Sequence, residues 1–401
     1  MSRANERGEA PGATGAPGAG THFPLGSALL LVGVFFLTFM SRTILAPLLL
    51  SIEADLGVSH AVGGSFFLVI SVGLMATMLS SGFVSQRLSH HQTISVAVGL
   101  VGVGLLIVSS SQALGWFRVG LVVLGAGAGL YLPSGIATLT DVTPPGQWGR
   151  AMALHELGPI LGLAAGPLLA ELVLRVASWR VLLAALGVAS IWMGLVFARR
   201  GAGGRFHGEP PHWAALREVA ATRRFWVIAF FFVMAIGLEL GVYSMLPTYL
   251  VVERGMERSL VNSVVSTSRL TSLLMIFLAG WLSDHLGVQR VFGVVAIAAG
   301  AVTALIGFVE GPILVAAVYL QPMLISAFFP AGHSALAGVS TPERRNLAIS
   351  VVIPLAYLFG AGLIPAILGR LAEAGASGTG FIAIGIIMAA GALVAPFATS
   401  R

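Results

Sequence analysis

Apolar segments of membrane-spanning length recur along almost the whole of this sequence of 401 residues. A helix needs about 20 consecutive apolar residues to cross the hydrocarbon core of a bilayer, and it must satisfy its own backbone hydrogen bonds there. Hydrophobic residues make up 57% of the chain and charged residues 9%, whereas a soluble domain carries about 25% charged residues. The chain is therefore expected to be an all-α membrane protein that crosses the bilayer many times.

The hydropathy pattern predicts twelve transmembrane helices in two groups of six. The predicted spans are 27–51, 61–86, 91–111, 116–138, 149–174, 178–198, 224–252, 261–285, 290–309, 312–336, 345–370 and 378–399. A long polar connection separates the sixth span from the seventh, and the first residues are rich in Gly, Ala and Pro, which favours disorder. The chain is thus divided into a disordered tail (1–22), a first six-helix bundle (23–198), a cytoplasmic linker (199–223) and a second six-helix bundle (224–401).

The placement of the arginines predicts the orientation of the chain in the membrane. Cytoplasmic loops of membrane proteins carry an excess of Lys and Arg. Arginines gather in the linker, for example Arg199, Arg200, Arg223 and Arg224, and the loops on the other side hold fewer of them. We therefore expect both termini in the cytoplasm and place the chain in the inner membrane of a bacterium.

The two groups of spans repeat one another in sequence. Gly280–Gly287 follows the eighth span, and Gly82–Ser89 stands at the matching place after the second. Leu132–Gly135 in the fourth span matches Phe329–Gly332 in the tenth at nearly the same offset. Duplicated six-helix halves are typical of secondary transporters, which bind their substrate near the middle of the membrane between the halves.

These motifs resemble those of the major facilitator superfamily along essentially the full chain. Residues Gly280–Arg290 fit its loop motif Gly-x-Leu-x-Asp-x-x-Gly-x-x-Arg, while the first-half copy carries Gln86 in place of the aspartate and Ser89 in place of the second glycine. The resemblance implies two pseudo-symmetric six-helix bundles that work by alternating access. It also implies that Asp284 and Arg290 form a conformational gate.

Two arginines, Arg42 and Arg269, lie inside predicted spans. Arginine keeps its charge in a protein, so each must find water, a partner or an anionic ligand. We predict that both bind a small anionic substrate, with a carboxylate as the first choice. The resemblance places the first and seventh helices on opposite walls of a cavity, so that Arg42 would face Glu239. The alternative is an Arg–Glu pair that holds the halves together or gates the cavity.

Three further residues are candidates for proton coupling. Glu239 lies near the middle of the seventh span, and His155 and Glu156 lie in the fifth. Buried carboxyl and imidazole groups relay protons in many transporters. Adjacent residues on a helix diverge by about 100°, so at most one of His155 and Glu156 is expected to face the cavity. The alternatives are a permanent salt bridge for Glu239 and a hydrogen-bond network at the inner gate for the other two.

Three uncharged polar residues complete the predicted binding site. Tyr131 and Tyr357 lie within spans, and Gln321 offers an amide donor in the tenth. We predict that they contact the substrate, although tyrosines in membrane helices also serve in packing.

The sequence as a whole favours a proton-coupled secondary transporter that takes up a small organic anion. Two rivals stay open, an exporter of drugs or metabolites with the same fold and a receptor or scaffold that transports nothing. No enzyme motif, cofactor, metal site or nucleic-acid contact is expected, because cysteine is absent and no phosphate-binding loop is found. The expected partners are the anionic substrate, protons and the lipid bilayer, and the chain is expected to be a monomer.

Overall fold

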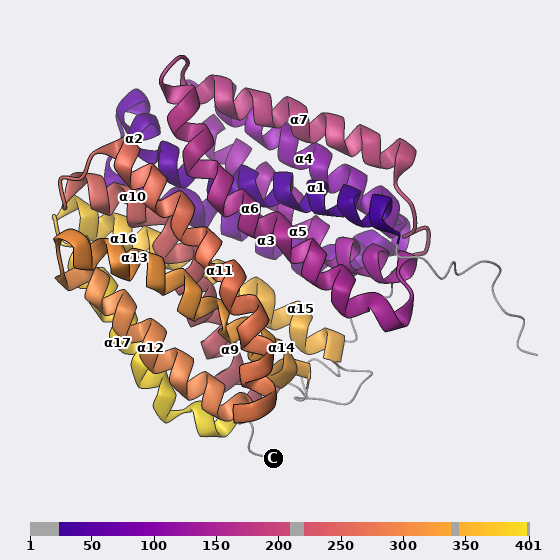
Figure 1. The fold of residues 1–401 in the computed structure, drawn as a ribbon. Coiled ribbons are helices and arrows are strands. Elements are labelled where there is room, and N and C mark those ends of the chain that lie inside the picture. The colour runs from indigo at the N-terminus through magenta and orange to yellow at the C-terminus, as the bar shows by residue number, and fades with distance from the viewer. Residues whose placement is uncertain (1–23, 209–219, 338–344, 399–401) are drawn as a thin grey trace, which may run out of the picture.

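The computed structural model describes residues 24–208, 220–337 and 345–398, and these residues form helices without any strand. The first half contains α1 (Leu25–Thr43), α2 (Leu45–Leu56), α3 (His60–Arg87), α4 (His90–Ser110), α5 (Leu114–Val142), η1 (Pro145–Gln147), α6 (Trp148–Leu174) and α7 (Trp179–Arg200). The two halves, coloured indigo to magenta and orange to yellow in Figure 1, lie side by side.

The second half contains more interrupted helices than the first. Its elements are α9 (Arg223–Ile236), η2 (Gly237–Gly241), α10 (Val242–Val252), α11 (Arg258–Leu286), α12 (Val288–Phe308), α13 (Gly311–Ser326), α14 (Phe328–Ala337), α15 (Arg345–Ala356), η4 (Tyr357–Leu363), α16 (Ile364–Glu373), α17 (Ser377–Ala390), η5 (Gly391–Leu393) and η6 (Ala395–Ala398). Both η2 and η4 are π-helical.

Helices account for all twelve predicted spans, which confirms the predicted fold class. Within the described residues, ten continuous helical stretches are long and apolar enough to cross a membrane. The other two predicted spans correspond to α11, with 29 residues, and to the shorter apolar stretch Ser377–Leu393. The protein is therefore a multi-pass membrane protein.

Proline interrupts two spans that the sequence predicted as continuous. A proline inside a helix removes a hydrogen bond and clashes with the carbonyl group four residues earlier. Pro47 follows the break between α1 and α2 at Ile44, and Pro330 follows the break between α13 and α14 at Ala327. The two breaks lie at the same distance before their prolines, so the same backbone clash explains both.

Glycines allow the helices of the first half to approach closely. A Cβ atom on Gly125 of α5 would overlap the backbone of Ile70 in α3, and one on Gly127 would lie 2.6 Å from the Ala97 carbonyl oxygen in α4. The glycine-rich stretch of α5 therefore packs between two neighbouring helices, as small residues do in membrane bundles.

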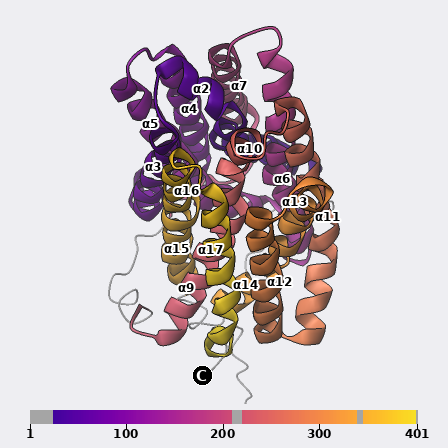
Figure 2. The same ribbon diagram turned by 90° about the vertical axis from the view of Figure 1, so that its left-hand side faces the viewer.

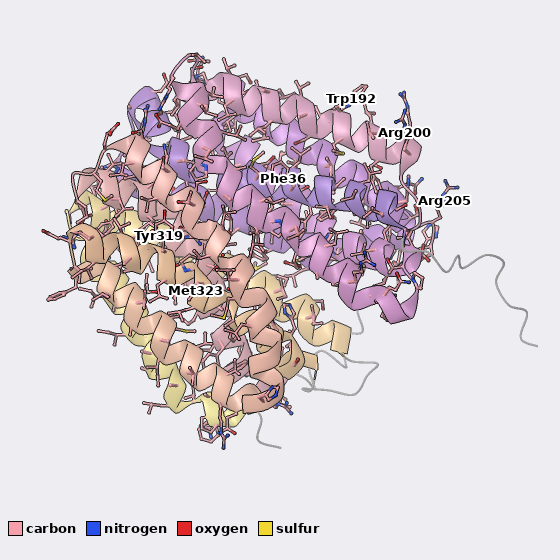
Figure 3. The ribbon with its side chains drawn as sticks, viewed as in Figure 1. Phe36, Trp192, Arg200, Arg205, Tyr319 and Met323 are labelled. Atoms are coloured by element: carbon pink, nitrogen blue, oxygen red, sulfur yellow. The ribbon has the colours of Figure 1, made fainter. Side chains whose placement is uncertain are left out.

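Both ends of the described chain lie on one side of the bundle, which we call the terminal side. Arg224 Nε, near the start of α9, donates to the carbonyl of Ala398 at 2.8 Å, and the C-terminal end is at the bottom of Figure 2. Arg200 and Arg205 lie on the same side, while Trp192 projects from α7 away from the bundle (Figure 3). The opposite side, which holds the α2–α3 and α16–α17 connections, is the distal side.

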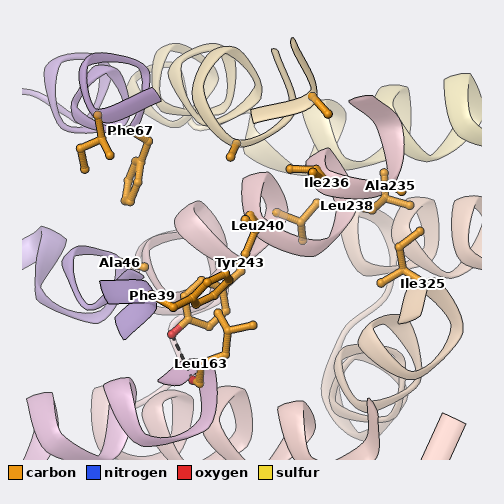
Figure 4. Packing of buried hydrophobic residues seen from close by; sticks show 14 of the residues in the cluster. Phe39, Ala46, Phe67, Leu163, Ala235, Ile236, Leu238, Leu240, Tyr243 and Ile325 are labelled. Atoms are coloured by element: carbon orange, nitrogen blue, oxygen red, sulfur yellow. Dashed lines mark hydrogen bonds between the residues drawn. The ribbon is translucent and has the colours of Figure 1, made fainter. Parts of the chain in front are cut away.

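The halves contact each other through helices that meet toward the distal side. There α2 packs on α10, α3 on α16 and α6 on α11. Helices α3 and α16 approach each other closely, because a Cβ atom on Gly64 would lie 2.5 Å from the Pro365 carbonyl oxygen and 3.0 Å from the Gly369 Cα atom. Tyr243 of the second half also donates to the Leu163 carbonyl of the first at 3.2 Å (Figure 4).

Candidate functional site

A narrow cavity lies between the halves and contains Arg42. In this conformation it is nearly closed, with a cavity volume of about 10 Å³. Its lining comes from α1, α3 and α5 of the first half and from the start of η4 in the second: Phe35, Thr38, Phe39, Arg42, Leu74, Met78, Ala128, Leu132 and Tyr357. We call it the Arg42 cavity.

One face of α1 supplies the polar and aromatic wall of this cavity. Phe35, Thr38, Phe39 and Arg42 follow the spacing i, i+3, i+4 and i+7, which places them on a single side of a helix. Arg42 lies in the last turn of α1, directly before the break at Ile44. The break thus ends the helix one residue after the residue that carries the charge.

Aromatic rings hold the Arg42 guanidinium. Its carbon lies 4.2 Å from the ring centre of Phe39 and 4.5 Å from that of Tyr357, which gives two cation–π contacts. Arg42 Nη2 also donates to the Tyr357 hydroxyl at 3.1 Å. In the described structure this bond uses one of the five donors of the guanidinium, and it links the two halves across the cavity.

The second membrane arginine, Arg269, does not line the Arg42 cavity. It pairs with Glu239 inside the second half. Arg269 Nη1 is 3.6 Å from Glu239 Oε1 and 3.5 Å from the Glu239 carbonyl oxygen. The Arg269 side chain is 1% exposed and the Glu239 side chain 15%. The ring of Tyr243 lies 4.9 Å from the guanidinium carbon. Because both residues belong to the second half, this pair does not hold the two halves together.

Gln321 supports the segment that carries Glu239. Its Nε2 donates to the Leu238 carbonyl at 2.9 Å, and both residues are buried. A π-helical turn disrupts the regular ladder of backbone bonds, so a side-chain donor at this carbonyl stabilises η2. Gln321 is not among the residues that line the Arg42 cavity.

Tyr131 and His155 form a buried pair one layer behind the cavity. The Tyr131 hydroxyl lies 3.0 Å from the Leu31 carbonyl oxygen and 2.8 Å from His155 Nε2. The His155 ring stacks on Phe35 with 4.3 Å between ring centres. Phe35 therefore separates the pair from the cavity, and Glu156 lies exposed on another face of α6. His155 and Glu156 diverge as the helix geometry predicted.

The predicted gate falls only partly within the described structure. The backbone of Asp284 belongs to α11, but its side chain lies outside the described part, and Arg290 is an exposed residue of α12. Sequence reasoning missed a different inter-half contact, at Glu171 of α6, which accepts from Asn262 of α11 at 3.1 Å and pairs with Arg258 at 3.3 Å. No pattern around Glu171 points to partners so distant in sequence.

Sequence reasoning also missed Phe35, Thr38 and Phe39 as cavity residues. The signal that could have found them is their position on the same helical face as Arg42.

A family model matches most of the chain. The model of the Major Facilitator Superfamily matches residues 31–265 and 243–401. The putative multidrug resistance protein MdtD of Pectobacterium atrosepticum is 30% identical over 153 residues, which are 36% of this chain and 31% of that protein. The protein of the same name from Cronobacter sakazakii is 31% identical over the same shares of the two chains.

Solved structures share the fold over nearly the whole chain. A bacterial homologue of the human lysosomal transporter Spinster, in an inward-facing and unoccupied conformation, has a TM-score of 0.78 at 15% identity and covers 95% of this chain and 97% of its own. A D-xylose–proton symporter has a TM-score of 0.70 at 13% identity over 92% and 97%. From the family match and this shared fold, we conclude that the chain belongs to the Major Facilitator Superfamily and is a membrane transporter, not an enzyme.

Proposed function

We propose that this transporter exports organic compounds that join an apolar body to an anionic group, and that it binds them in the Arg42 cavity. The observation that carries the proposal is the chemistry of the lining. A single guanidinium faces a wall that is otherwise aromatic and aliphatic apart from Thr38 and the Tyr357 hydroxyl. Ligand sites of this kind bury the apolar part of a ligand and use a few polar groups to orient it.

Export is favoured over the uptake of a small carboxylate that two membrane arginines suggested. Arg269 pairs with Glu239 and does not line the Arg42 cavity, so the proposed site has one arginine in place of a two-arginine clamp. A small carboxylate would offer no apolar surface to Phe35 and Phe39, which line the cavity. The relatives that match part of the chain are named as multidrug resistance proteins, which supports the exporter that the sequence left open.

The membrane potential also fits the export of an anion. A bacterial cytoplasm is negative, and a potential of 100 mV favours the exit of one negative charge by about 2.3 kcal/mol. We assign the terminal side to the cytoplasm because it carries many arginines. We also propose that the protein lies in the inner membrane and works there as a monomer.

Glu239 is the proposed proton carrier. Its pair with Arg269 is long, and within the described part of the chain Glu239 Oε2, Arg269 Nε and Arg269 Nη2 have no hydrogen-bond partner. A carboxyl group in such an incomplete pair exchanges a proton with less rearrangement than one in a fully bonded network. His155 and Glu156 stay as secondary candidates, because Phe35 separates His155 from the cavity.

The test uses purified protein in liposomes loaded with 2-naphthoate, an apolar acid, or with 2-naphthyl-methylammonium, a cation with the same ring system. We expect the wild type to release the acid faster than the cation, and Arg42→Ala to reduce release of the acid at least tenfold. Arg118→Ala is the matched control because Arg118 is an exposed residue of α5. Release of the acid by Arg42→Ala at the wild-type rate would contradict the proposal.

The same liposomes distinguish uptake from export. If an inward proton gradient accumulates acetate or succinate but not 2-naphthoate, the protein is an uptake symporter for small carboxylates. The arginine in the cavity is compatible with that second function, whereas the apolar lining is not.

A further inference from the structure

We infer that Thr38 is a second polar contact for the substrate. It selects compounds in which a hydrogen-bonding group is separated from the anionic group by about the length of one turn of α1. This inference rests on the proposed function, since it concerns the same cavity. It names the substrate class more closely: apolar acids that carry a hydroxyl or carbonyl substituent on the far side of the apolar body.

The first observation is that the Thr38 hydroxyl has no hydrogen-bond partner among the described residues, although Thr38 is only 3% exposed. Buried polar groups in native proteins are nearly always bonded, and an unbonded hydroxyl destabilises the fold. Threonine in a helix can bond to a carbonyl one turn earlier, and Thr43 of the same helix does so with Phe39 at 3.1 Å. Thr38 therefore forgoes a bond that its neighbour forms.

The second observation is the place of Thr38 in the site. It lines the Arg42 cavity and precedes Arg42 by four residues, so the two side chains leave α1 on the same face. Residues spaced in this way have Cβ atoms about 5–6 Å apart. A ligand whose anionic group binds Arg42 can thus place a neutral polar group near Thr38. Its apolar body then contacts the rings of Phe35 and Phe39.

Ser41 provides the matched comparison on the same helix. Its hydroxyl is also buried and without a partner, at 0% exposure, but Ser41 is not part of the cavity lining. Both hydroxyls are expected to destabilise the empty protein in the same way. Only the Thr38 hydroxyl can regain this stability, by forming a hydrogen bond with a bound substrate.

The experiment compares two substrates that differ by one hydroxyl group, 2-naphthoate and 6-hydroxy-2-naphthoate, in wild type, Thr38→Val, Thr38→Ser and Ser41→Ala. We expect wild type to release the hydroxylated acid with roughly 2- to 10-fold higher kcat/KM, as one neutral hydrogen bond allows. Thr38→Val is expected to lose this preference, and Thr38→Ser and Ser41→Ala to keep it. A monodisperse elution profile and a cooperative unfolding transition of each purified variant show that it is folded.

Thermal unfolding gives a second readout. Thr38→Val and Ser41→Ala are both expected to raise Tm, because each removes an unbonded hydroxyl, while only Thr38→Val changes selectivity. A preference that persists in Thr38→Val, or that the wild type does not show, overturns the role of Thr38 but leaves apolar-acid export intact. If the wild type releases neither naphthoate, the proposed function fails, and the inference about Thr38 fails with it.

Discussion

Glu239 and Arg269 place two opposite charges in the interior of the second half without completing their hydrogen bonds. The closest nitrogen–oxygen distance in the pair is 3.6 Å, and three of its nitrogen and oxygen atoms have no hydrogen-bond partner in the residues that the structure describes. Desolvation of a buried pair can outweigh the attraction between its charges, so such an arrangement is weak evidence for a role in stability. A role in the transport cycle accounts for the pair better. Binding of a proton by Glu239, or a change of partner during the cycle, would reduce the desolvation cost of the pair.

Glu239→Gln is therefore expected to uncouple transport from protons. The amide cannot bind and release a proton, so an imposed pH gradient should no longer drive substrate movement, whereas exchange of labelled for unlabelled substrate should continue. Both rates are measured in proteoliposomes with 2-naphthoate. Glu373→Gln serves as the control, because Glu373 is an exposed carboxyl group at the end of α16. Gradient-driven transport at the wild-type rate in Glu239→Gln would exclude this residue as the carrier.

The sequence places Arg42, Glu239 and Arg269 inside predicted spans but does not identify their partners. Which of them meet depends on how α1, η2 and α11 rotate and pack, and no local pattern encodes that. The face that joins Arg42 to Phe35, Thr38 and Phe39 does follow local spacing, and it could have been predicted.

At the scale of elements, the π-helical segments η2 and η4 pack against each other through glycine. A Cβ atom on Gly360 of η4 would lie 2.5 Å from the Val233 carbonyl oxygen and 2.7 Å from the Gly237 nitrogen. Glu239 lies within η2, and Tyr357 begins η4. Short π-helical insertions are often found at functional sites, and here they carry two of the proposed site residues.

The two halves share the packing of this region but not its backbone conformation. Gly360 matches Gly162 of α6, and both approach the first helix of their own half, where Gly162 faces Met40. Yet α6 continues as a regular helix through Gly162, while the chain around Gly360 is π-helical. A π-turn has no sequence signature of its own, because it arises from the closeness of a neighbouring helix.

Gly360→Ala is expected to destabilise the protein by about 1–3 kcal/mol, which is typical of overpacking in a tight interior. The added methyl group would push η4 away from η2 and lower Tm, and transport should fall with it. Gly293→Ala in α12 is the control, since a Cβ atom there meets nothing within 4 Å and alanine favours the helix. Equal Tm values for the two variants would show that the contact between η2 and η4 is not tight.

At the scale of the whole molecule, polar contacts on the distal side join the halves. Glu171 binds Asn262 and Arg258 of the other half, and it also pairs with Arg175 of its own helix at 3.3 Å. Ser266 of α11 donates to the Ala164 carbonyl nearby. Alternating access requires the distal contacts to break while the terminal side closes. Glu171 is therefore placed to bias the balance between the two states.

Glu171→Gln is expected to shift this balance toward separation of the halves on the distal side. Arg258 is 44% exposed, and an exposed pair contributes only about 0.2–1 kcal/mol, which corresponds to a population change of less than roughly sixfold. Arg175→Ala is the matched control, because it removes a partner of Glu171 within the first half and leaves the contact between halves in place. Both variants should keep the fold.

Spin labels measure the shift directly. The chain contains no cysteine, so Val176→Cys and Phe308→Cys, at positions 87% and 78% exposed in the two halves, introduce unique labelling sites. Distance distributions between the labels should gain a longer component in Glu171→Gln and stay unchanged in Arg175→Ala. The same longer component in both variants would assign the effect to α6 alone. An unchanged distribution in Glu171→Gln would mean that apolar packing of α3 on α16 closes the distal side without this ion pair.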